Sequence, residues 1–177
     1  IWMASNLSTS RYRNGAYIPY ILNSNQWALI KSPALSFYNH DNTYETNYGK
    51  QYNWYAVNDT QGICPMGWHI PSNNEWTILS DFLGGLNVAG GKMKATGTQY
   101  WSFPSNGSNT SGFTGLPGGF RNVDGTFGIL GYNGFWWSST EENELKAFNR
   151  SIIYTDNLLS VGSTSKNQGF SVRCIKD

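Results

Sequence analysis

The sequence predicts an α+β fold with one or two short helices, long loops and a C-terminal antiparallel sheet. Three observations predict it. A capped, amphipathic helix pattern occurs in the first half, Gly-, Ser- and Asn-rich sequence fills the middle, and short apolar runs separated by turn residues follow to the end. Since no linker-like stretch separates these parts, we expect residues 1–177 to form a single domain.

Length, charge and hydropathy limit the possible functional classes. The 177 residues are enough to bury a sizeable core. Charged residues make up only 13% and the net charge is +1, which argues against binding to nucleic acid or to an anionic membrane. No run approaches the roughly 20 apolar residues that cross a bilayer, so membrane insertion is not expected. No signal peptide is recognisable at Ile1, and we therefore expect a mature or trimmed segment whose true N-terminus is missing.

Aromatic residues are unusually frequent, at 16% of the chain, with 8 Trp, 11 Tyr and 9 Phe beside 20 Gly. This composition predicts a loop-rich fold with large flat side chains in its core. The same side chains suit a surface that stacks on ligands. Those in apolar runs are expected in the core: Trp54, Trp68, Trp76, Trp136 and Trp137.

The first third of the chain gives weak local signals. Residues 1–7 read as a strand that enters the fold. The range 8–47 scatters its aromatic residues among Asn, Ser and Pro, and we expect it to be irregular, with short strands around Ile18 and Phe37. The apolar run 51–57 fits either a strand or one or two helical turns, because its length does not decide between them.

One helix is clearly signalled. Ser-Asn-Asn-Glu at 72–75 follows a proline and matches the capping box, in which the first and fourth side chains satisfy each other's backbone N–H groups. Gly84 and Gly85 end the pattern, because glycine accepts the left-handed conformation that follows a helix. The apolar face is expected to carry Trp76, Leu79 and Leu83, flanked by Ile78 and Phe82.

The middle of the chain changes from helix to loop and then to hairpin. A second short helix or turn is predicted over 91–96. The range 98–119 is dense in Gly, Ser, Asn, Thr and Pro and reads as long loops. Residues 121–127 then read as two strands around an Asp-Gly turn.

The C-terminal third reads as a β-meander. Strands are predicted over 134–138, 146–154 and 169–175, and the first of them, GFWWS, is apolar enough to be buried. A polar hairpin at 155–168 lies between the last two strands.

The chain has two cysteines, Cys64 and Cys174. If the protein is exported, a disulfide is favoured over two free thiols. Closing a loop of about 110 residues would stabilise the fold by roughly 4–5 kcal/mol in the chain-entropy model.

Several stretches resemble one known family across nearly the whole chain and in the same order. They are IWMASNL (1–7), YGKQYNWYAVND (48–59), GICPMGWHIPSNNEWTILSDFLGG (62–85), GGKMKATGTQYW (90–101), SGFTGLPGGFRN (111–122), GFWWSSTE (134–141) and GFSVRCIKD (169–177). They are similar to the Fibrobacter succinogenes major paralogous domain, which is frequent in secreted and surface proteins of Bacteroidetes-type bacteria. The resemblance implies a C-type lectin-like fold, which formylglycine-generating enzymes also resemble.

The resemblance also implies export and display at the cell surface or in the outer membrane. Some relatives lie at pilus tips or in surface lipoproteins. Others are targets of diversity-generating retroelements, which vary the segment before the last strand, here about 142–168. Four aromatic residues lie among polar neighbours and are candidates for an exposed platform that stacks on a ligand: Tyr100, Trp101, Phe148 and Tyr154. With polar residues of this segment they are the candidate ligand-binding residues: Tyr100, Trp101, Asn143, Lys146, Phe148, Asn149, Tyr154, Asn157 and Asn167.

The sequence offers few candidate catalytic residues. His69 lies in GWHIP before the helix, where a packed, hydrogen-bonded residue is favoured over a general base. The Ser138–Glu141 run lacks the G-x-S-x-G elbow of a serine nucleophile. Formylglycine-generating relatives use a pair of reactive cysteines near the C-terminus, where this chain has only Cys174. We therefore expect a protein that is not an enzyme.

No metal or cofactor is predicted. The E-P-N or Q-P-D loop and the W-N-D strand of calcium-dependent lectins are both missing. A calcium ion takes six to eight oxygen ligands, but the carboxylates are dispersed except in the EENE run at 141–144, which reads as a solvated turn. A structural calcium ion remains the minor alternative.

Three functions follow, in order of preference. The first is an extracellular binding module that recognises a surface protein or a glycan through its loops and the 142–168 hairpin. The second is a structural or tip subunit of a surface appendage, which contacts only its neighbouring subunit. The third is an enzyme of the formylglycine-generating fold. Oligomeric state is not encoded in any pattern of the sequence.

Overall fold

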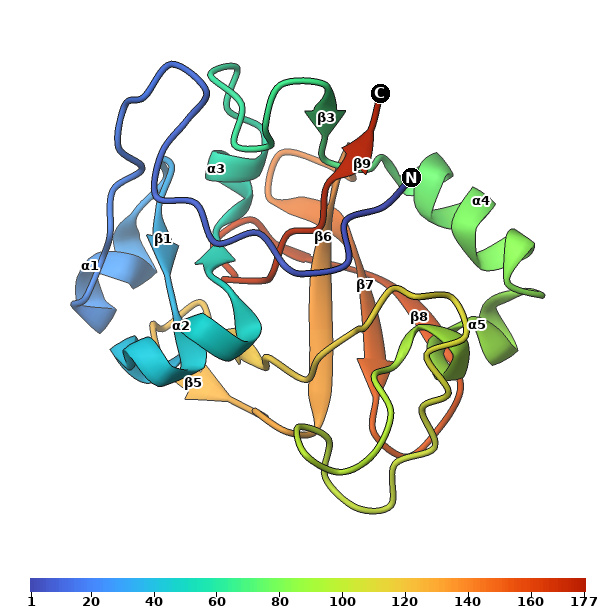
Figure 1. Cartoon of the computed structure of the whole chain (residues 1–177). Helices are drawn as coiled ribbons and strands as arrows, with labels where there is room; N and C mark the ends of the chain where they lie inside the picture. Colours follow the sequence, from blue (N-terminus) through green and yellow to red (C-terminus); the bar gives the residue numbers. More distant parts are fainter.

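A three-stranded antiparallel sheet lies at the centre of the computed structural model, which describes all 177 residues (Figure 1). Its order is β6 (Asn133–Glu141), β7 (Lys146–Ile153) and β8 (Leu159–Ser165). The register between β6 and β7 shifts between Trp137 and Glu141. The strands predicted over 134–138 and 146–154 are β6 and β7, and the predicted polar hairpin supplies β8, the edge strand.

The two faces of this sheet belong to different cores. Successive side chains of a strand point to opposite faces, so Trp136 and Trp137 enter different clusters, and both are fully buried. Trp136 packs in a cluster of 10 buried residues that includes Trp76. Trp137 packs in a cluster of 16 that includes Trp54 and the cysteines. All four tryptophans were expected in the core.

Helices α4 (Asn73–Phe82) and α5 (Leu86–Met93) adjoin the Trp136 side of the sheet (Figure 1). The capping box of Ser72 and Glu75 is present in both directions. The second helix begins earlier than predicted. Its C-terminal glycines allow close packing against the β7–β8 turn, since a Cβ at Gly90 would lie 2.3 Å from the Leu158 carbonyl oxygen.

The first third of the chain contains helices that the sequence analysis did not expect. They are α1 (Ser24–Leu29), the short 3-10 helix η1 (Tyr38–His40) and α2 (Asn42–Tyr48). Helix α1 buries only Trp27 and α2 buries no residue, so neither carries an amphipathic pattern. The ranges 8–23 and 30–34 are irregular as expected, and a short strand, Leu35–Ser36, lies beside Phe37. The expectation was wrong for the three helices, because they depend on caps and tertiary contacts. The cap of α2 is Asp41, whose side chain accepts from Thr43 N at 2.8 Å.

The ambiguous run 51–57 contains both predicted alternatives. Strand β2 (Gln51–Tyr52) pairs with β1 (Leu35–Ser36), and α3 (Trp54–Val57) follows at once. Asn53 separates them, since its side chain accepts from Ala56 N at 3.1 Å and thereby caps the helix.

The two ends of the chain lie side by side (Figure 1). Strand β9 (Ile175–Lys176) pairs with β3 (Trp68–His69), and Trp2 bridges Ile175 on the other side. Residues 1–7 are tied by backbone hydrogen bonds to 172–174 rather than forming the regular strand expected. The predicted strand over 169–175 likewise makes isolated bridges before β9.

The remaining predictions of local structure are confirmed. Strands β4 (Phe120–Arg121) and β5 (Phe127–Gly128) form the predicted hairpin, and the range 98–119 contains no helix or regular strand. Cys64 and Cys174 form a disulfide with Sγ atoms 2.05 Å apart. The α+β class is therefore confirmed, with more short helices than expected. None of the helices has the length and apolar character that a membrane span requires.

Candidate ligand-binding site

Trp101, which was expected on an exposed platform, is buried with 1% of its surface accessible. Its indole N–H donates to the Gly115 carbonyl at 3.0 Å, and it packs in the same cluster as Trp136. The ammonium group of Lys94 lies 5.4 Å from the ring centroid. The prediction was wrong because the polar loop that surrounds Trp101 in sequence folds over the indole.

Asn149 is also buried, since it lies in the middle strand of the sheet opposite Gly162. Two other predicted side chains in the 142–168 segment contact other parts of the protein. Tyr154 is half-buried with its ring 5.3 Å from that of Tyr132. Asn167 donates to the Ile30 carbonyl at 2.9 Å.

The remaining predicted residues do not converge on one surface. Asn143 and Lys146 lie at the β6–β7 turn, where the Asn143 side chain accepts from the Lys146 backbone N–H at 3.0 Å. Asn157 lies at the β7–β8 turn, at the other end of the sheet. Phe148 is half-buried on β7. A single ligand-binding platform made of these residues is therefore not formed, and their individual roles in ligand binding stay predictions.

Residues 1–8 and 111–116 form a ridge on the surface, and each of two hollows is lined in part by this ridge. The guanidinium of Arg173, fully buried, joins its two parts: it donates to the Met3 carbonyl at 2.9 Å and to the Phe113 carbonyl. It also donates through Nη2 to Asn6 Oδ1 at 2.7 Å. No carboxylate pairs with it, and burial lowers the pKa of Arg173 to about 9. This buried cation therefore fixes the ridge through carbonyl groups.

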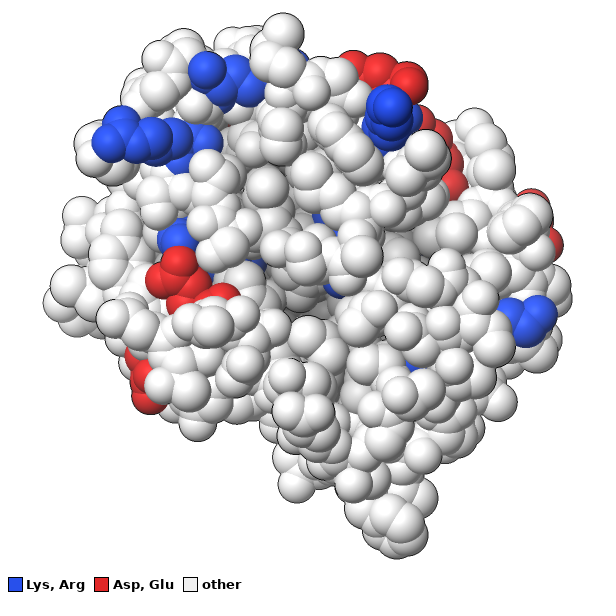
Figure 2. Space-filling model, viewed as in Figure 1, with Lys and Arg blue, Asp and Glu red and all other residues white.

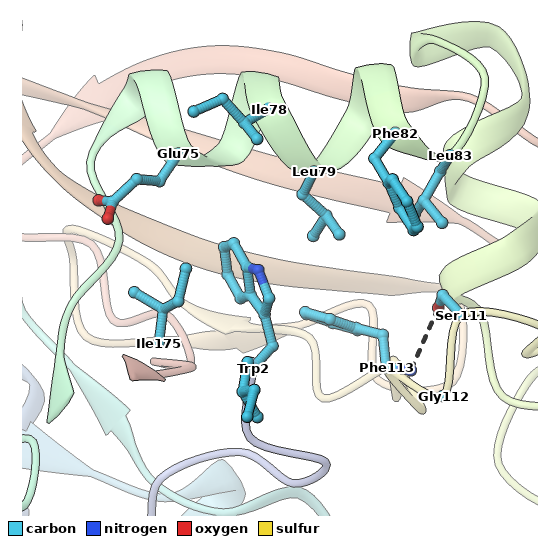
Figure 3. Close-up of a pocket in the computed structure, with 11 residues that line it drawn as sticks. Trp2, Glu75, Ile78, Leu79, Phe82, Leu83, Ser111, Gly112, Phe113 and Ile175 are labelled. Atoms are coloured by element: carbon cyan, nitrogen blue, oxygen red, sulfur yellow. Dashed lines mark hydrogen bonds between the residues drawn. The ribbon is translucent and has the colours of Figure 1, made fainter. Parts of the chain in front are cut away.

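The first section of the ridge, residues 1–2 and 111–113, borders an apolar groove of 620 Å³, which we call the groove. Figure 3 shows α4 along one wall and Trp2 and Phe113 opposite it, with Leu79 and Phe82 directed into the space between. Trp2 packs on Trp76, with ring centroids 4.6 Å apart. Phe82 remains 86% exposed, so the groove presents apolar surface to solvent.

One end of the groove is polar. His69 lies between two carboxylates, with Nδ1 2.6 Å from Asp177 Oδ1 and Nε2 2.7 Å from Glu75 Oε1. The hydrogen bond to Asp177, and then the one to Glu75, raises the pKa of His69. Burial opposes ionisation of Glu75, but hydrogen bonds from Ser72 and His69 outweigh it and lower the pKa of Glu75. His69 is thus the hydrogen-bonded junction residue that the sequence analysis favoured.

The second section of the ridge, within 4–8 and 114–116, borders a polar hollow of 430 Å³, which we call the cleft. Figure 2 shows a face with few charged groups and a depression near its middle, between the N-terminal segment, α2 and the loop that precedes β4. An ion pair between Glu45 and the buried Lys50 lies at its edge, and Ser8 Oγ donates to Glu45 at 3.2 Å. All but one of the lining residues are small or polar, the exception being Leu116. The lining consists of Ala4, Ser5, Asn6, Ser8, Glu45, Thr46, Asn47, Gly49, Thr114 and Leu116.

Four tyrosines form a row that begins in η1, follows α2 and ends at Tyr100. The ring centroids are 5.5 Å apart from Tyr38 to Tyr44, 6.3 Å from Tyr44 to Tyr48 and 5.9 Å from Tyr48 to Tyr100. All four are half-buried. Burial raises the pKa of Tyr48, so this hydroxyl stays protonated and can both donate and accept. Sequence reasoning found only Tyr100; the four-residue spacing of Tyr44 and Tyr48 becomes a signal once α2 is known to be helical.

Comparison with known proteins gives one match. The model of the Fibrobacter succinogenes major domain matches residues 1–176. The chain belongs to this family. The ridge, the groove and the cleft are therefore features of a Fibrobacter succinogenes major domain. No curated protein and no solved structure matches the chain, so the likeness to C-type lectins stays a prediction.

The reactive groups of this Fibrobacter succinogenes major domain are few. Both cysteines are held in the disulfide. In the acidic run 141–144, Glu141 pairs with Lys166 at 2.9 Å. The chain contains no group of three or more His, Cys, Asp or Glu side chains placed to hold a metal ion. The geometry of the surface thus offers two hollows of opposite chemistry, both lined in part by one ridge.

Proposed function

We propose that this domain is a binding module displayed outside the cell, where it recognises a protein or a glycan. The observation that carries the proposal is the pair of hollows against one ridge, the groove apolar and the cleft polar. Binding sites in proteins are typically preformed concave surfaces of this size with a few polar groups. Arg173 holds the ridge from within, so both hollows are preorganised.

Display outside the cell is supported by the disulfide, because such bonds persist in oxidising compartments. It is also supported by the sparse charge of the chain and by its family, which the sequence analysis associates with secreted and surface proteins. Binding rather than catalysis is supported by the state of the cysteines: thiol chemistry of the formylglycine-generating kind needs a free, activated thiol. Titration of native, unreduced protein with a thiol reagent tests this, since reactive thiols would favour the enzyme.

A structural subunit of a surface appendage is the second candidate, and the groove favours it. Exposed apolar side chains such as Ile78 (59%) and Phe82 (86%) fit burial against a neighbouring subunit. The two candidates differ in the partner: a binding module takes a ligand from outside, whereas a subunit takes another part of its own assembly.

A glycan array and a pull-down from surface proteins, both with the intact oxidised domain, test the proposal. For the groove, Phe82→Ser is the informative variant and Leu29→Ser the matched control, because Leu29 is 81% exposed on α1 and lies outside the groove. We expect Phe82→Ser to weaken the binding of a protein partner and Leu29→Ser to leave that binding unchanged. Absence of any ligand in both screens would overturn the proposed function.

A further inference from the structure

We infer that the cleft is a binding site for a neutral carbohydrate, which is recognised by free polar side chains on a rigid frame and by the tyrosine row beside it. This inference rests on the proposed binding function and specifies one of its ligands. The cleft brings together side chains from three segments distant in sequence, at 4–8, 45–49 and 114–116.

The polar groups of the cleft are of two kinds. Asn6 is held in place: its Oδ1 accepts from Trp136 at 2.8 Å and from Arg173, and its Nδ2 donates to the Tyr48 carbonyl at 2.8 Å. Ser5 and Asn47 are exposed, and their side chains make no hydrogen bond within the protein. Free amide and hydroxyl groups on a rigid frame suit a ligand whose hydroxyls both donate and accept.

The aromatic partner of the sugar would be the tyrosine row. Helix α2 contributes Thr46 and Asn47 to the cleft and, from another face, Tyr44 and Tyr48 to the row. Tyr48 adjoins the cleft, since its carbonyl accepts from the Asn6 side chain at 2.8 Å. The row continues to Tyr100 on the loop that faces α2. A sugar ring presents C–H groups on its faces and hydroxyls around its rim, and aromatic rings beside hydrogen-bonding side chains match both.

The charge of the cleft indicates a neutral ligand. Glu45 is its one charged lining residue, and Lys50 pairs with it. Arg173 lies behind Asn6, fully buried, with four of its N–H bonds directed to Met3, Phe113 and Asn6. Both cations near the cleft, Lys50 and Arg173, are therefore buried, whereas recognition of a sulfate or a carboxylate would require an exposed one.

The test is a binding titration of the intact, oxidised domain with a panel of neutral hexose and pentose oligosaccharides, each beside its sulfated or sialylated counterpart. We expect saturable binding of a neutral member, with an affinity that salt changes little. Asn47→Ala should weaken it about tenfold, as the loss of one ligand hydrogen bond does, and Tyr100→Ala should weaken it similarly. Asn87→Ala is the matched control, an exposed asparagine on α5 without side-chain hydrogen bonds.

Equal affinities for Asn47→Ala and the wild type would overturn the inference, and so would preference for the acidic counterparts. Asn47 is exposed and unbonded, so its variant is expected to fold; melting temperatures check this for both variants. Failure of the whole glycan panel, with a protein partner captured through Phe82, would overturn the carbohydrate site while leaving the proposed binding function intact. If neither the glycan panel nor the pull-down gives a ligand, the proposed binding function itself is overturned.

Discussion

The groove and the cleft are neighbours that share a ridge but differ in almost everything else. The far wall of the groove is α4, a helix of ten residues with a reciprocal capping box and a buried tryptophan. The far wall of the cleft is α2, a helix of seven residues with one cap and no buried residue. The comparison shows that one ridge can line two hollows of opposite chemistry, apolar where Trp2 and Phe113 face α4 and polar where Ser5 and Asn6 face α2.

The largest effect is expected from removing the disulfide, because it fastens the segment that carries Arg173 and therefore supports both hollows. The double variant Cys64→Ala/Cys174→Ala should lose about 4–5 kcal/mol of stability, since the bond closes a loop of 110 residues. Denaturant unfolding measures it, with reduced wild type as the control. A loss under about 1 kcal/mol would show that other contacts hold this segment.

The second largest effect is expected from Arg173→Met, which should lower the free energy of unfolding by about 3 kcal/mol. The substitution leaves the Met3 and Phe113 carbonyls without their hydrogen-bond donor. Both hollows should lose their shape together. Arg11→Met is the control, since Arg11 is exposed and its side chain donates hydrogen bonds only to Gly15 and Tyr17. If denaturant unfolding places the two variants at equal stability, the guanidinium does not hold the ridge.

Ser72→Ala should affect the groove alone. Loss of the N-cap hydrogen bond to Glu75 should cost about 1 kcal/mol. Carbohydrate affinity at the cleft should be unchanged, because α4 does not contribute to it. Unfolding curves and the carbohydrate titration measure the two effects separately. A change in the titration would mean that the hollows are coupled.

Asp41→Ala is the equivalent change on the other helix and should cost about 0.5 kcal/mol, at the low end of cap effects. The side chain accepts from Thr43 N, but α2 buries no residue and can fray without opening the core. Hydrogen exchange of the α2 amides should accelerate while those of α4 do not. A cost as large as that of Ser72→Ala would contradict the contrast between the two helices.

The smallest effect is the pH dependence at the polar end of the groove. The pKa of His69 is raised on folding, so its contribution is fully present below about pH 6.5 and is lost as pH rises through the folded pKa. The side chain is 40% exposed, and solvent screening limits the effect to a few tenths of a kcal/mol. Denaturation midpoints at about pH 5.5 and about pH 8, compared between wild type and His69→Gln, measure it. A wild type that gains relative stability on the alkaline side would reverse the sign.

Local sequence patterns predicted the elements whose stability is local. The box at Ser72 and Glu75 defined α4 correctly, and short apolar runs separated by turn residues located β6 and β7. The same reasoning missed α1 and α2, because their exposed faces carry no periodic apolar pattern. Among the candidate site residues, it named Tyr100, whose ring lies beside that of Tyr48. It also expected Trp101 to be exposed, but this residue has polar neighbours in sequence and apolar neighbours in space.

The sequence by itself determined the α+β class, the aromatic core, the disulfide and the family. Each follows from composition, short-range spacing or motifs that are read in order along the chain. Only the tertiary structure decided where a ligand can bind. The groove and the cleft are made where residues 1–8 and 111–116 meet over Arg173, and no pattern along the chain records a contact between segments so far apart.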